Sequence, residues 1–394
     1  MLERIRPSVT ELFWWLILGA IKVLYSNPLK RPRTTGRMNS TLYLLTLNSE
    51  RCKMNRSIGV HITFTLGLLL AAGTITPALA EQELIPLEMA ISPPSANRVA
   101  FIIAYEEGIY EKNGLDVDHY ISPQTAEAMA RDGMIVNPEY IRAGAPTPLA
   151  TGTGTNAIVG PTTSASGPQD IVILATLDGV MRGHIVAQPE ITSLEQLKGK
   201  RLGYTVPGGR THFVALVVAE KMGWDPVQDI SLISDSRMDA LKSGRVDAII
   251  ANENRLAEAR AAGYEPLVDL STWDVPIAST GITATRSWLA DNQEPTRRFI
   301  KSLVEANALL KKDKDVSLRA MEKWWGIKDK EKQDLFYAGA ADVPRKPYPS
   351  VNGIKKVMEV YDSNEMRKHE PEDFYDDSFI RELDESGYID SLYE

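Results

Sequence analysis

The sequence predicts an α/β fold with two lobes, and three observations support that fold class. Short apolar runs alternate with amphipathic helical patterns along most of the chain, which is typical of largely parallel sheets covered by helices. The 394 residues suffice for two lobes of about 100–200 residues each. A pattern of leucine, glycine and a short apolar strand occurs twice, at 149–160 and 241–252, and hints at two similar lobes. Any connection from a helix through a glycine to a strand has this pattern, so its repetition alone does not establish two similar lobes.

The elements of the first half are expected in the following order. The stretch "LIPLEMAI" (84–91) reads as a strand, and the spacing of the apolar residues predicts a helix over 96–110. Gly114 ends that helical segment, and the alternating "LDVDHYI" (115–121) follows as a second strand. Residues 128–155 are rich in Pro, Gly and Thr, which predicts a loop around a short helix. Further strands are expected at 156–160 and 170–176.

The second half repeats the alternation and then becomes helical. Ser193 and Gln196 form a capping box, and 208–223 predicts a glycine turn followed by an amphipathic helix that Gly223 closes. From Glu294 onward the pattern is helical, and the aromatic residues there are expected in the core rather than in a site. These aromatic residues are Trp324, Trp325, Phe336 and Tyr337. The remaining expected elements are strands at 201–206, 230–234 and 246–251 and a helix at 236–243.

Residues 54–80 have the layout of a secretory signal peptide. Arg56 supplies the positive start, and an apolar run extends over 58–72. Pro77 then precedes an A-x-A motif, which predicts cleavage after Ala80. No cysteine follows the apolar run for lipid attachment, so the expected product is a soluble exported protein.

The position of this signal within the chain has two interpretations. We expect translation to start at Met54, which makes residues 1–53 an upstream extension. The alternative is a membrane anchor built on the apolar run 12–25. That run is shorter than the ~20 residues that span a bilayer, and an anchor leaves the cleavage motif unexplained.

The charge and the cysteine count exclude several classes of function. Ten of the 44 Lys and Arg and three of the 52 Asp and Glu precede the cleavage site, so 34 basic and 49 acidic side chains remain, a formal charge of −15. Such a chain repels phosphate backbones, which argues against nucleic-acid binding. The only cysteine, Cys52, lies in the removed part, so the mature chain has no disulfide and no cysteine nucleophile. The remaining histidines lack metal-ligand spacing, and we expect no metal and no cofactor.

Three stretches carry a resemblance to a known family. They are "GIYEKNGLDVD" (108–118), "SLEQLKGKRLGY" (193–204) and "DALKSGRVDAII" (239–250). Their order and spacing resemble those of the periplasmic solute-binding proteins of ABC importers. The chain is similar in particular to the NMT1/THI5-like branch, which contains binders of aliphatic sulfonates, taurine, nitrate and formyl-aminopyrimidine. The resemblance runs from about Leu84 to Leu310.

The resemblance implies a type II-like periplasmic binding protein, with two lobes joined by two crossing strands, a ligand cleft between the lobes and a helical C-terminal region. Lobe 1 would comprise 84–180 and 273–394, and lobe 2 would comprise 181–272. The stretch 271–280 would form the second crossing strand. The chain departs from the family pattern by an inserted segment at 128–147 near the expected cleft, and by Asn156 where Asp is usual. The ligand therefore does not follow from the family alone.

The function that the resemblance implies is that of a non-catalytic receptor. It would close its lobes around a small organic solute, with an anion such as a sulfonate, a carboxylate or a pyrimidine precursor fitting the polar loops. It would deliver that solute to a permease in the inner membrane, and a monomer is expected. Two alternatives stay open: an enzyme like the pyrimidine-precursor synthases of this fold, and the effector-sensing domain of a regulator. The first usually has a cysteine-rich motif, and the second needs an attached DNA-binding or membrane module.

Candidate ligand-binding residues follow the carboxyl ends of the expected strands, where ligands bind in open α/β sheets. Four polar corners and one residue of the second crossing strand supply them. The candidates are Ser92, Ser95, Asn97, Thr162, Thr163, Ser164, Gly209, Arg210, Thr211, His212, Asn252, Glu253 and Trp273.

The stretch "PGGRTH" (207–212) is the most informative of these corners. A Gly-Gly turn at a helix start lets backbone N–H groups face a ligand, and the helix dipole adds partial positive charge. Arg210 could clamp a carboxylate or sulfonate with two hydrogen bonds, or it could be a solvated residue at the helix start. Trp273 is either a stacking wall of the cleft or a packed hinge residue.

Overall fold

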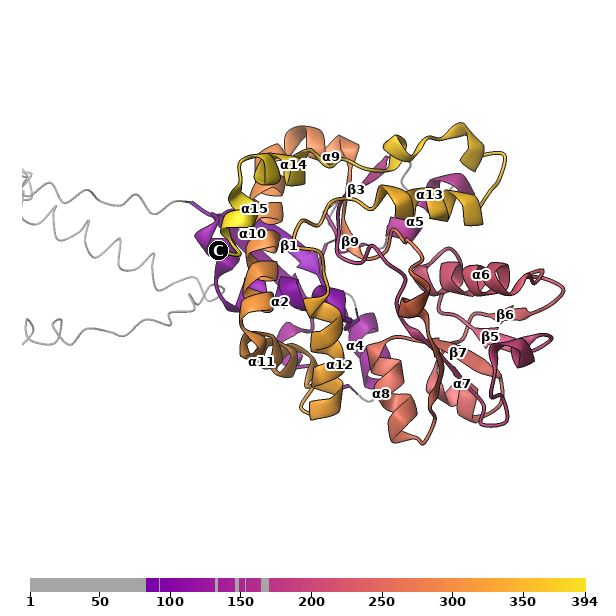
Figure 1. Cartoon of the computed structure of the whole chain (residues 1–394). Coiled ribbons are helices and arrows are strands. Elements are labelled where there is room, and N and C mark those ends of the chain that lie inside the picture. The colour runs from indigo at the N-terminus through magenta and orange to yellow at the C-terminus, as the bar shows by residue number, and fades with distance from the viewer. Residues whose placement is uncertain (1–82, 92, 132–133, 146–148, 153, 164–169) are drawn as a thin grey trace, which may run out of the picture. The chain divides into compact units, whose positions relative to one another are not determined.

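The computed structural model describes residues 83–394, except residues 92, 132–133, 146–148, 153 and 164–169, and of residues 161–163 it describes the backbone only. All of them belong to one compact unit, 77–394 (Figure 1). The expected upstream extension, the signal peptide with its cleavage site, and Cys52 lie outside the described residues.

The first lobe is built on a pair of parallel strands covered by helices. Its main elements are β1 (Ile85–Ala90), β2 (Leu115–Tyr120), α2 (Val99–Glu106), α10 (Gln293–Lys312) and α11 (Lys314–Trp325). Ile85 lies opposite Leu115 in the strand pair, and α2 packs against both α10 and α11. Phe299 of α10 is fully buried and stacks on Phe101, with ring centroids 6.2 Å apart. The core of this lobe thus joins the start of the described chain to its C-terminal third.

The helix that was expected over 96–110 is divided. A 3-10 turn, η1 (Ala96–Arg98), leads into α2, and a short helix α3 (Ile109–Lys112) follows. The break falls at Gly108, which has a φ of 64°, a left-handed conformation that glycine adopts without steric cost.

The second lobe is a five-stranded sheet in the order β6-β5-β7-β4-β8. Its strands are β4 (His184–Ala187), β5 (Arg201–Gly203), β6 (Ser231–Ile233), β7 (Ala248–Ala251) and β8 (Pro266–Asp269). Its helices are α6 (Arg210–Met222), α7 (Met238–Lys242) and α8 (Glu253–Ala261). The expectation of largely parallel sheets is wrong here, because β4 is antiparallel to both β7 and β8 while β5 is parallel to β6 and β7. The expected end of α6 at Gly223 is confirmed, with that glycine left-handed at φ 68°.

Two chain segments connect the lobes. β3 (Ile171–Thr176) pairs antiparallel with β9 (Gly281–Thr285), and beyond this pair residues 177–183 run antiparallel to residues 274–280. The N–H of Met181 donates to the carbonyl of Val275 at 2.8 Å. We call 177–183 and 274–280 the crossing segments. The strand expected at 271–280 is only partly correct, because a 3-10 turn occupies Leu270–Trp273 and Asp274 is left-handed with a φ of 50°.

The apolar stretch 156–160 is a helix, not the expected strand. It lies within α5 (Gly154–Thr163), whose first turn is fixed on a crossing segment: the N–H of Gly154 donates to Ser279 O at 2.8 Å, and Thr155 Oγ1 donates to Ala278 O at 3.0 Å. A short apolar run does not distinguish a buried strand from a buried helix, and tertiary hydrogen bonds decide it here.

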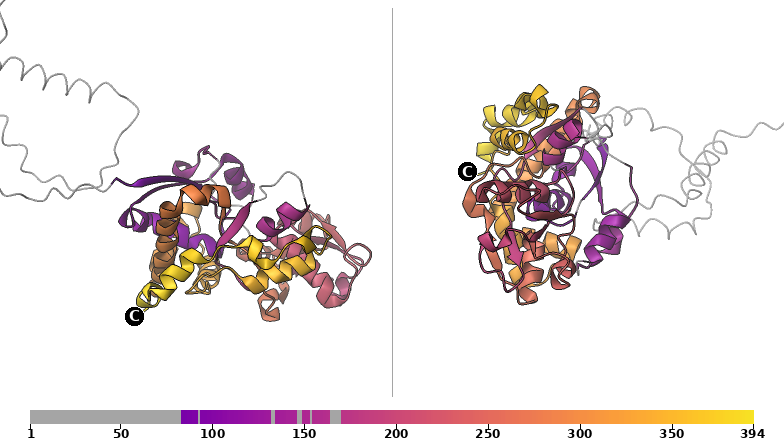
Figure 2. Two further views of the ribbon diagram at one scale, coloured as in Figure 1. Left: turned by 90° about the horizontal axis from the view of Figure 1, so that it is seen from above. Right: turned by 90° about the vertical axis from the view of Figure 1, so that its right-hand side faces the viewer.

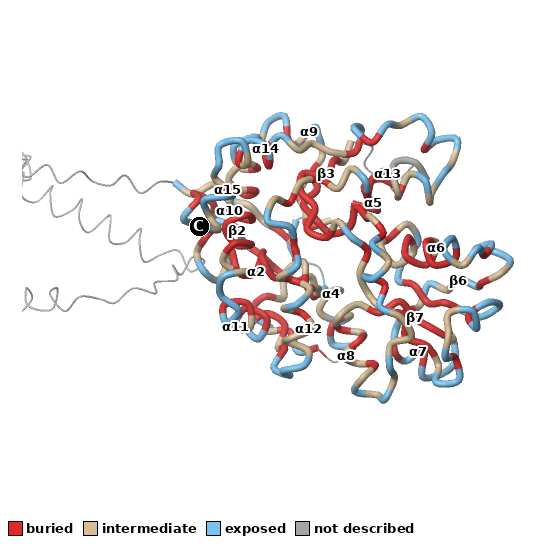
Figure 3. Tube along the Cα trace, viewed as in Figure 1, coloured by how far each residue is buried: buried red, intermediate tan, exposed pale blue. Residues whose placement is uncertain are grey.

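The C-terminal helices spread over both lobes (Figure 2). α12 (Lys330–Ala341) packs against α8 and η1, α13 (Val351–Val360) packs against α5 and α6, and α14 (Ser378–Glu385) packs against α10. The expected core positions of Trp324, Trp325 and Phe336 are confirmed, and Tyr337 is partly buried. Buried stretches are visible along the tube in the region of α10 and α11 (Figure 3). The lobe boundaries at 181 and 272 stay a prediction, since α5 and α13 share a core cluster with α6.

The remaining elements connect these layers. They are α4 (Pro123–Arg131), η2 (Pro138–Tyr140), η3 (Leu194–Leu197), α9 (Arg286–Asp291), η5 (Met366–Lys368), η6 (Pro371–Phe374) and α15 (Tyr388–Ser391). The inserted segment 128–147 includes the end of α4 and η2. No helix in the described part of the chain has the length and apolar character that a membrane span needs.

Candidate functional site

Three corners of the fold converge on a group of charged side chains where the lobes meet. Arg98 ends η1 after the first strand, Arg210 begins α6 and Glu253 begins α8. Asp178 and Arg182 belong to the first crossing segment. We call these five residues the arginine cluster.

Arg210 is held by the crossing segment. Its Nη2 donates to the main-chain oxygen of Arg182 at 2.8 Å and lies 3.4 Å from Oδ2 of Asp178. The side chain of Arg210 is 19% exposed, and Asp178 is buried. Arg210 is therefore not a solvated residue at a helix start.

Arg98 reaches the same region from the first lobe. Its Nη1 donates to Ser95 Oγ at 2.8 Å and to Pro93 O at 2.9 Å. Burial and the neighbouring charge of Arg210 lower the pKa of Arg98 to about 10, and the charge of Glu253 opposes this effect. The guanidinium groups of Arg98 and Arg210 are therefore near enough for their like charges to repel.

Two N–H donors of this cluster are unused. The Nε atoms of Arg98 and Arg210 are both buried, and neither has a hydrogen-bond partner among the described residues. An unmade hydrogen bond of a buried charged group is costly, and an oxyanion is the acceptor that guanidinium groups bind best. The arrangement thus keeps two buried donors for an added acceptor.

The carboxylates of the cluster position the arginines. Oδ1 of Asp178 lies 3.7 Å from Nε of Arg182, so Asp178 stands between two guanidinium groups. Arg182 also donates from Nη1 to Gly339 O at 2.9 Å and pairs with Asp342, which ties the crossing segment to the end of α12. A Cβ added at Gly339 would lie 3.3 Å from Oε1 of Glu253, so that carboxylate lies close to α12 as well.

Some of the other sequence-predicted residues lie at or next to the arginine cluster, and the rest lie elsewhere. Ser95 accepts from Arg98 and donates to Asn97 Oδ1 at 2.5 Å, so both lie at the cluster. Asn252 is the N-cap of α8, where its side chain accepts from the N–H of Arg255 at 3.0 Å. Gly209 precedes the first residue of α6.

The remaining predicted residues lie elsewhere. Thr211 Oγ1 accepts from the N–H of Thr205 at 2.8 Å and so holds its own loop. His212 hydrogen-bonds with Gly208 and Tyr361, which are not part of the cluster. Trp273 is partly buried against the core shared by α5, α6 and α13. Ser92 and Ser164, and the side chains of Thr162 and Thr163, lie outside the described residues.

Sequence reasoning missed three members of the cluster: Arg98, Asp178 and Arg182. Asp178 follows β3 by two residues, so the corner rule that selected the other candidates would have found it. Arg98 directly follows the predicted Asn97. Arg182 gives no such signal, because its role depends on the position of α12.

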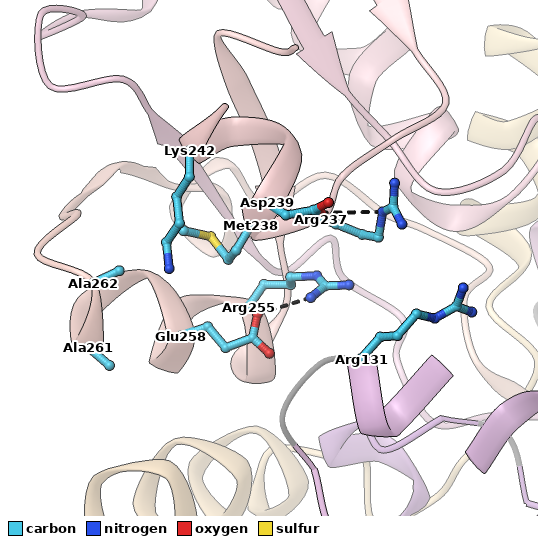
Figure 4. A pocket seen from close by; sticks show the side chains of 9 residues that line it. All are labelled: Arg131, Arg237, Met238, Asp239, Lys242, Arg255, Glu258, Ala261 and Ala262. Atoms are coloured by element: carbon cyan, nitrogen blue, oxygen red, sulfur yellow. Dashed lines mark hydrogen bonds and ion pairs between the residues drawn. The ribbon is translucent and has the colours of Figure 1, made fainter. Parts of the chain in front are cut away.

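A pocket opens where α4 faces α7 and α8 (Figure 4). Its volume is about 580 Å³, and Arg131, Arg237 and Arg255 supply much of its charge. Arg237 pairs with Asp235 at 2.9 Å, and Arg255 pairs with Glu258 at 3.0 Å. We place the candidate site at the arginine cluster instead, because the buried Nε atoms of Arg98 and Arg210 have no hydrogen-bond partner among the described residues. The described residues contain no cluster of His, Cys, Asp and Glu that could hold a metal.

Comparison with known proteins decides the family. Residues 81–322 match the sequence model of the NMT1-like family. The chain belongs to the NMT1-like family. The resemblance inferred from the three sequence stretches is thereby confirmed. A search of curated protein sequences found no match.

Solved structures similar to this NMT1-like protein have the same fold at low identity. The nitrate-binding protein NrtA of Synechocystis PCC 6803 is 13% identical, with a TM-score of 0.59 over 79% of this chain and 91% of the other. A putative sulfonate-binding protein SsuA of Methylobacillus flagellatus KT is 12% identical, with a TM-score of 0.55 over 78% and 96%. The alkanesulfonate-binding protein SsuA of Xanthomonas axonopodis pv. citri, bound to MOPS, is 16% identical, with a TM-score of 0.51 over 71% and 91%. The predicted fold class, a two-lobe periplasmic binding protein, is confirmed.

Proposed function

We propose that this NMT1-like protein is the exported solute-binding component of an ABC importer, which captures a small organic anion at the arginine cluster and delivers it to an inner-membrane permease. The observation that carries the proposal is the pair of buried, unpartnered Nε–H groups of Arg98 and Arg210. The anion is a sulfonate, a carboxylate or a compound like a pyrimidine precursor.

The charges of Arg98 and Arg210 can explain both the binding of the anion and the closure of the lobes. Without a ligand, Arg98 and Arg210 repel one another, and this repulsion favours separation of the lobes. An oxyanion between them replaces the repulsion with charge-assisted hydrogen bonds from both lobes. Because those bonds form only when the lobes are close, the ligand shifts the population toward the closed form.

The proposed export and cleavage involve residues that lie outside the part of the chain that the structure describes. The protein is exported by the signal at 54–80, is cleaved after Ala80 and acts in the periplasm as a monomer. Membership of a family whose solved structural relatives include periplasmic binding proteins supports this view. Mass spectrometry of the N-terminus of the mature protein tests the cleavage site. No observation on the described residues favours the alternatives, an enzyme or the sensing domain of a regulator.

The decisive experiment is thermal unfolding of the protein, purified after export, against a panel of sulfonates, nitrate, carboxylates and pyrimidines. A ligand present at 100 times its dissociation constant adds about 2.7 kcal/mol to the unfolding free energy. We expect one anion class to raise the midpoint in the wild type and not in Arg98→Gln. The matched control is Arg319→Gln, since Arg319 is 63% exposed and lies far along the chain in α11. A shift that survives in Arg98→Gln would contradict the proposed site.

A further inference from the structure

The pocket between α4 and the two helices α7 and α8 differs from the arginine cluster in position and in chemistry. Its volume of about 580 Å³ lies within the usual range of small-molecule sites. None of the residues that line it belongs to the arginine cluster (Figure 4). We call it the α4–α8 pocket.

The charges at the start of α7 balance one another. Arg237 binds Asp235 through both Nε and Nη2, each at 2.9 Å, and this contact lowers the pKa of Asp235 to about 2. Asp239 lies 3.5 Å from Nε of Arg237 and 2.9 Å from Nη2 of Arg245. Two arginines and two ionised aspartates therefore form a neutral group, of which Arg237 and Asp239 line the pocket.

The charges on the other side of the pocket do not balance. Arg255 and Glu258 form a neutral pair on α8, with Nη1 and Oε2 3.0 Å apart. The two remaining charged residues of the lining are Arg131, which ends α4, and Lys242, which ends α7. Neither forms an ion pair with another described residue. The described residues thus give this pocket an excess of two positive charges, which attracts anions.

These two cations lie at opposite ends of the pocket. In Figure 4 the guanidinium groups of Arg131, Arg237 and Arg255 lie around one end, and the amine of Lys242 lies at the other. The side chain of Met238 lies between the two ends in the same view, and that residue is buried. The pocket therefore has two positive ends separated by an apolar side chain.

We propose that the α4–α8 pocket binds an elongated dianion, an α,ω-dicarboxylate, with one carboxylate at Arg131 and the other at Lys242. Arg131 can bind a carboxylate through two parallel hydrogen bonds, and Lys242 supplies a compact positive charge. A dianion neutralises the excess charge of the pocket, and its methylene chain covers Met238. A monocarboxylate leaves one of the two cations without a partner and therefore binds more weakly.

Calorimetric titration of the protein, purified after export, tests the proposal with dicarboxylates from succinate to suberate and with hexanoate. Each probe is titrated into the wild type and into Arg98→Gln, in which the arginine cluster has lost one of its two unused donors. We expect at least one dicarboxylate to bind both proteins with affinities within threefold of each other. Hexanoate should bind Arg98→Gln at least about tenfold more weakly than that dicarboxylate, because it lacks one charge-assisted hydrogen bond.

Three outcomes of these titrations overturn the proposal. They are the absence of binding by every dicarboxylate, hexanoate that binds as tightly as the best dicarboxylate, and dicarboxylate binding that is lost in Arg98→Gln. The last outcome places the dicarboxylate at the arginine cluster. Failure of the anion panel to bind at the arginine cluster leaves the expected result in Arg98→Gln unchanged, so the two sites are judged separately.

Substitution of each cation tests the two ends of the site. Arg131→Gln and Lys242→Gln should each weaken the best dicarboxylate at least about tenfold. Arg131→Lys, which keeps the charge, should recover part of the lost affinity, and a merely structural role of Arg131 would not give this recovery. The control Arg319→Gln, at a 63% exposed residue of α11 outside the pocket, should bind within threefold of the wild type. Unchanged affinity in Arg131→Gln or in Lys242→Gln overturns the assignment.

Discussion

Nη2 of Arg210 donates to the main-chain oxygen of Arg182 across 2.8 Å, which links the first residue of α6 to the segment that joins the lobes. The same guanidinium lies 3.4 Å from Asp178 and keeps its Nε free. One side chain thus has two partners in the protein and one donor for a ligand. We therefore expect replacement of Arg210 to lower both the unfolding free energy and the affinity for the anion. Replacement of Arg98 should lower the affinity for the anion and leave the unfolding free energy almost unchanged.

Arg210→Met should lower the unfolding free energy by about 2–4 kcal/mol, because it leaves the buried carboxylate of Asp178 with a weaker set of partners. Urea unfolding measures this loss. Arg210→Met combined with Asp178→Asn should recover part of it, since the uncompensated charge is then removed. If the double variant is as unstable as the sum of the two single variants, the pair is not coupled.

Arg98→Gln should not destabilise the unliganded protein beyond about 0.5 kcal/mol and should weaken anion binding at least tenfold. The pKa of Arg98, lowered to about 10, shows that its charge is unfavourable in the folded state, so its removal offsets the lost hydrogen bonds. Urea unfolding and calorimetric titration with the anion found in the panel measure the two effects. A large loss of stability would mean that Arg98 serves the fold.

His119 should make the protein less stable in mild acid. Its ring is buried against Tyr110, with Nε2 3.0 Å from the hydroxyl, and burial lowers its pKa from 6.5 to about 4. Between those two values the unfolded chain binds a proton that the folded protein does not. The stabilisation from the neutral ring is therefore complete above pH 6.5 and falls by about 2 kcal/mol between pH 7 and pH 5.

Urea unfolding at pH 7, 6 and 5 measures this contribution. The variant His119→Gln cannot titrate, so its unfolding free energy should change less with pH over the same interval. Equal pH dependence in the variant and the wild type would assign the acid sensitivity to other groups.

Tyr140 should anchor the inserted segment to the first lobe. Its ring stacks on that of Trp324 with centroids 3.8 Å apart and an angle of 2°, and its hydroxyl donates to Glu106 at 3.1 Å. Tyr140→Ala should cost about 3–5 kcal/mol, and Tyr140→Phe, which keeps the stacking, about 1 kcal/mol. The control in the same segment is Ile135→Ala, because that side chain is 78% exposed. Similar unfolding midpoints for Tyr140→Ala and Ile135→Ala would contradict the anchoring.

Two glycines should respond in opposite ways to the same substitution. A Cβ at Gly353 of α13 would lie 2.1 Å from the carbonyl carbon of Ile277, so Gly353→Ala should cost about 1–3 kcal/mol by displacing a crossing segment. At Gly160 a Cβ meets nothing within 4 Å, and Gly160→Ala should gain up to about 1 kcal/mol through helix propensity. Thermal unfolding compares the two, and a gain at Gly353 would refute the close packing.

The sequence predicted the elements whose boundaries are set locally. The helix 210–222 has glycines before and after it, and β5, β6 and β7 are apolar runs between turn residues, so these elements could be placed without tertiary knowledge. The strands β4 and β8 were not among the expected elements. The run 156–160 could not be placed in this way, since hydrogen bonds to Ser279 and Ala278, more than a hundred residues away, fix the start of α5.

The candidate site was predictable in part for the same reason. Arg210 and Glu253 follow strand ends and begin helices, a pattern visible in the sequence. Arg182 is held in addition by α12, which returns from the C-terminal region and accepts its hydrogen bond at Gly339 O. Contacts of that sequence separation have no local signal.

Gly339 also limits how the two lobes can move. A Cβ there would lie 2.7 Å from the Cβ of Ala96 and 3.3 Å from a carboxylate oxygen of Glu253. α12 therefore packs very closely on η1 of the first lobe and lies beside the start of α8 in the second lobe. Opening about the crossing segments alone would pull α12 away from one of these surfaces. Small side chains at such a contact permit sliding instead, so closure in this protein should combine a hinge with a shear of α12, and the C-terminal region would set the amplitude of that motion.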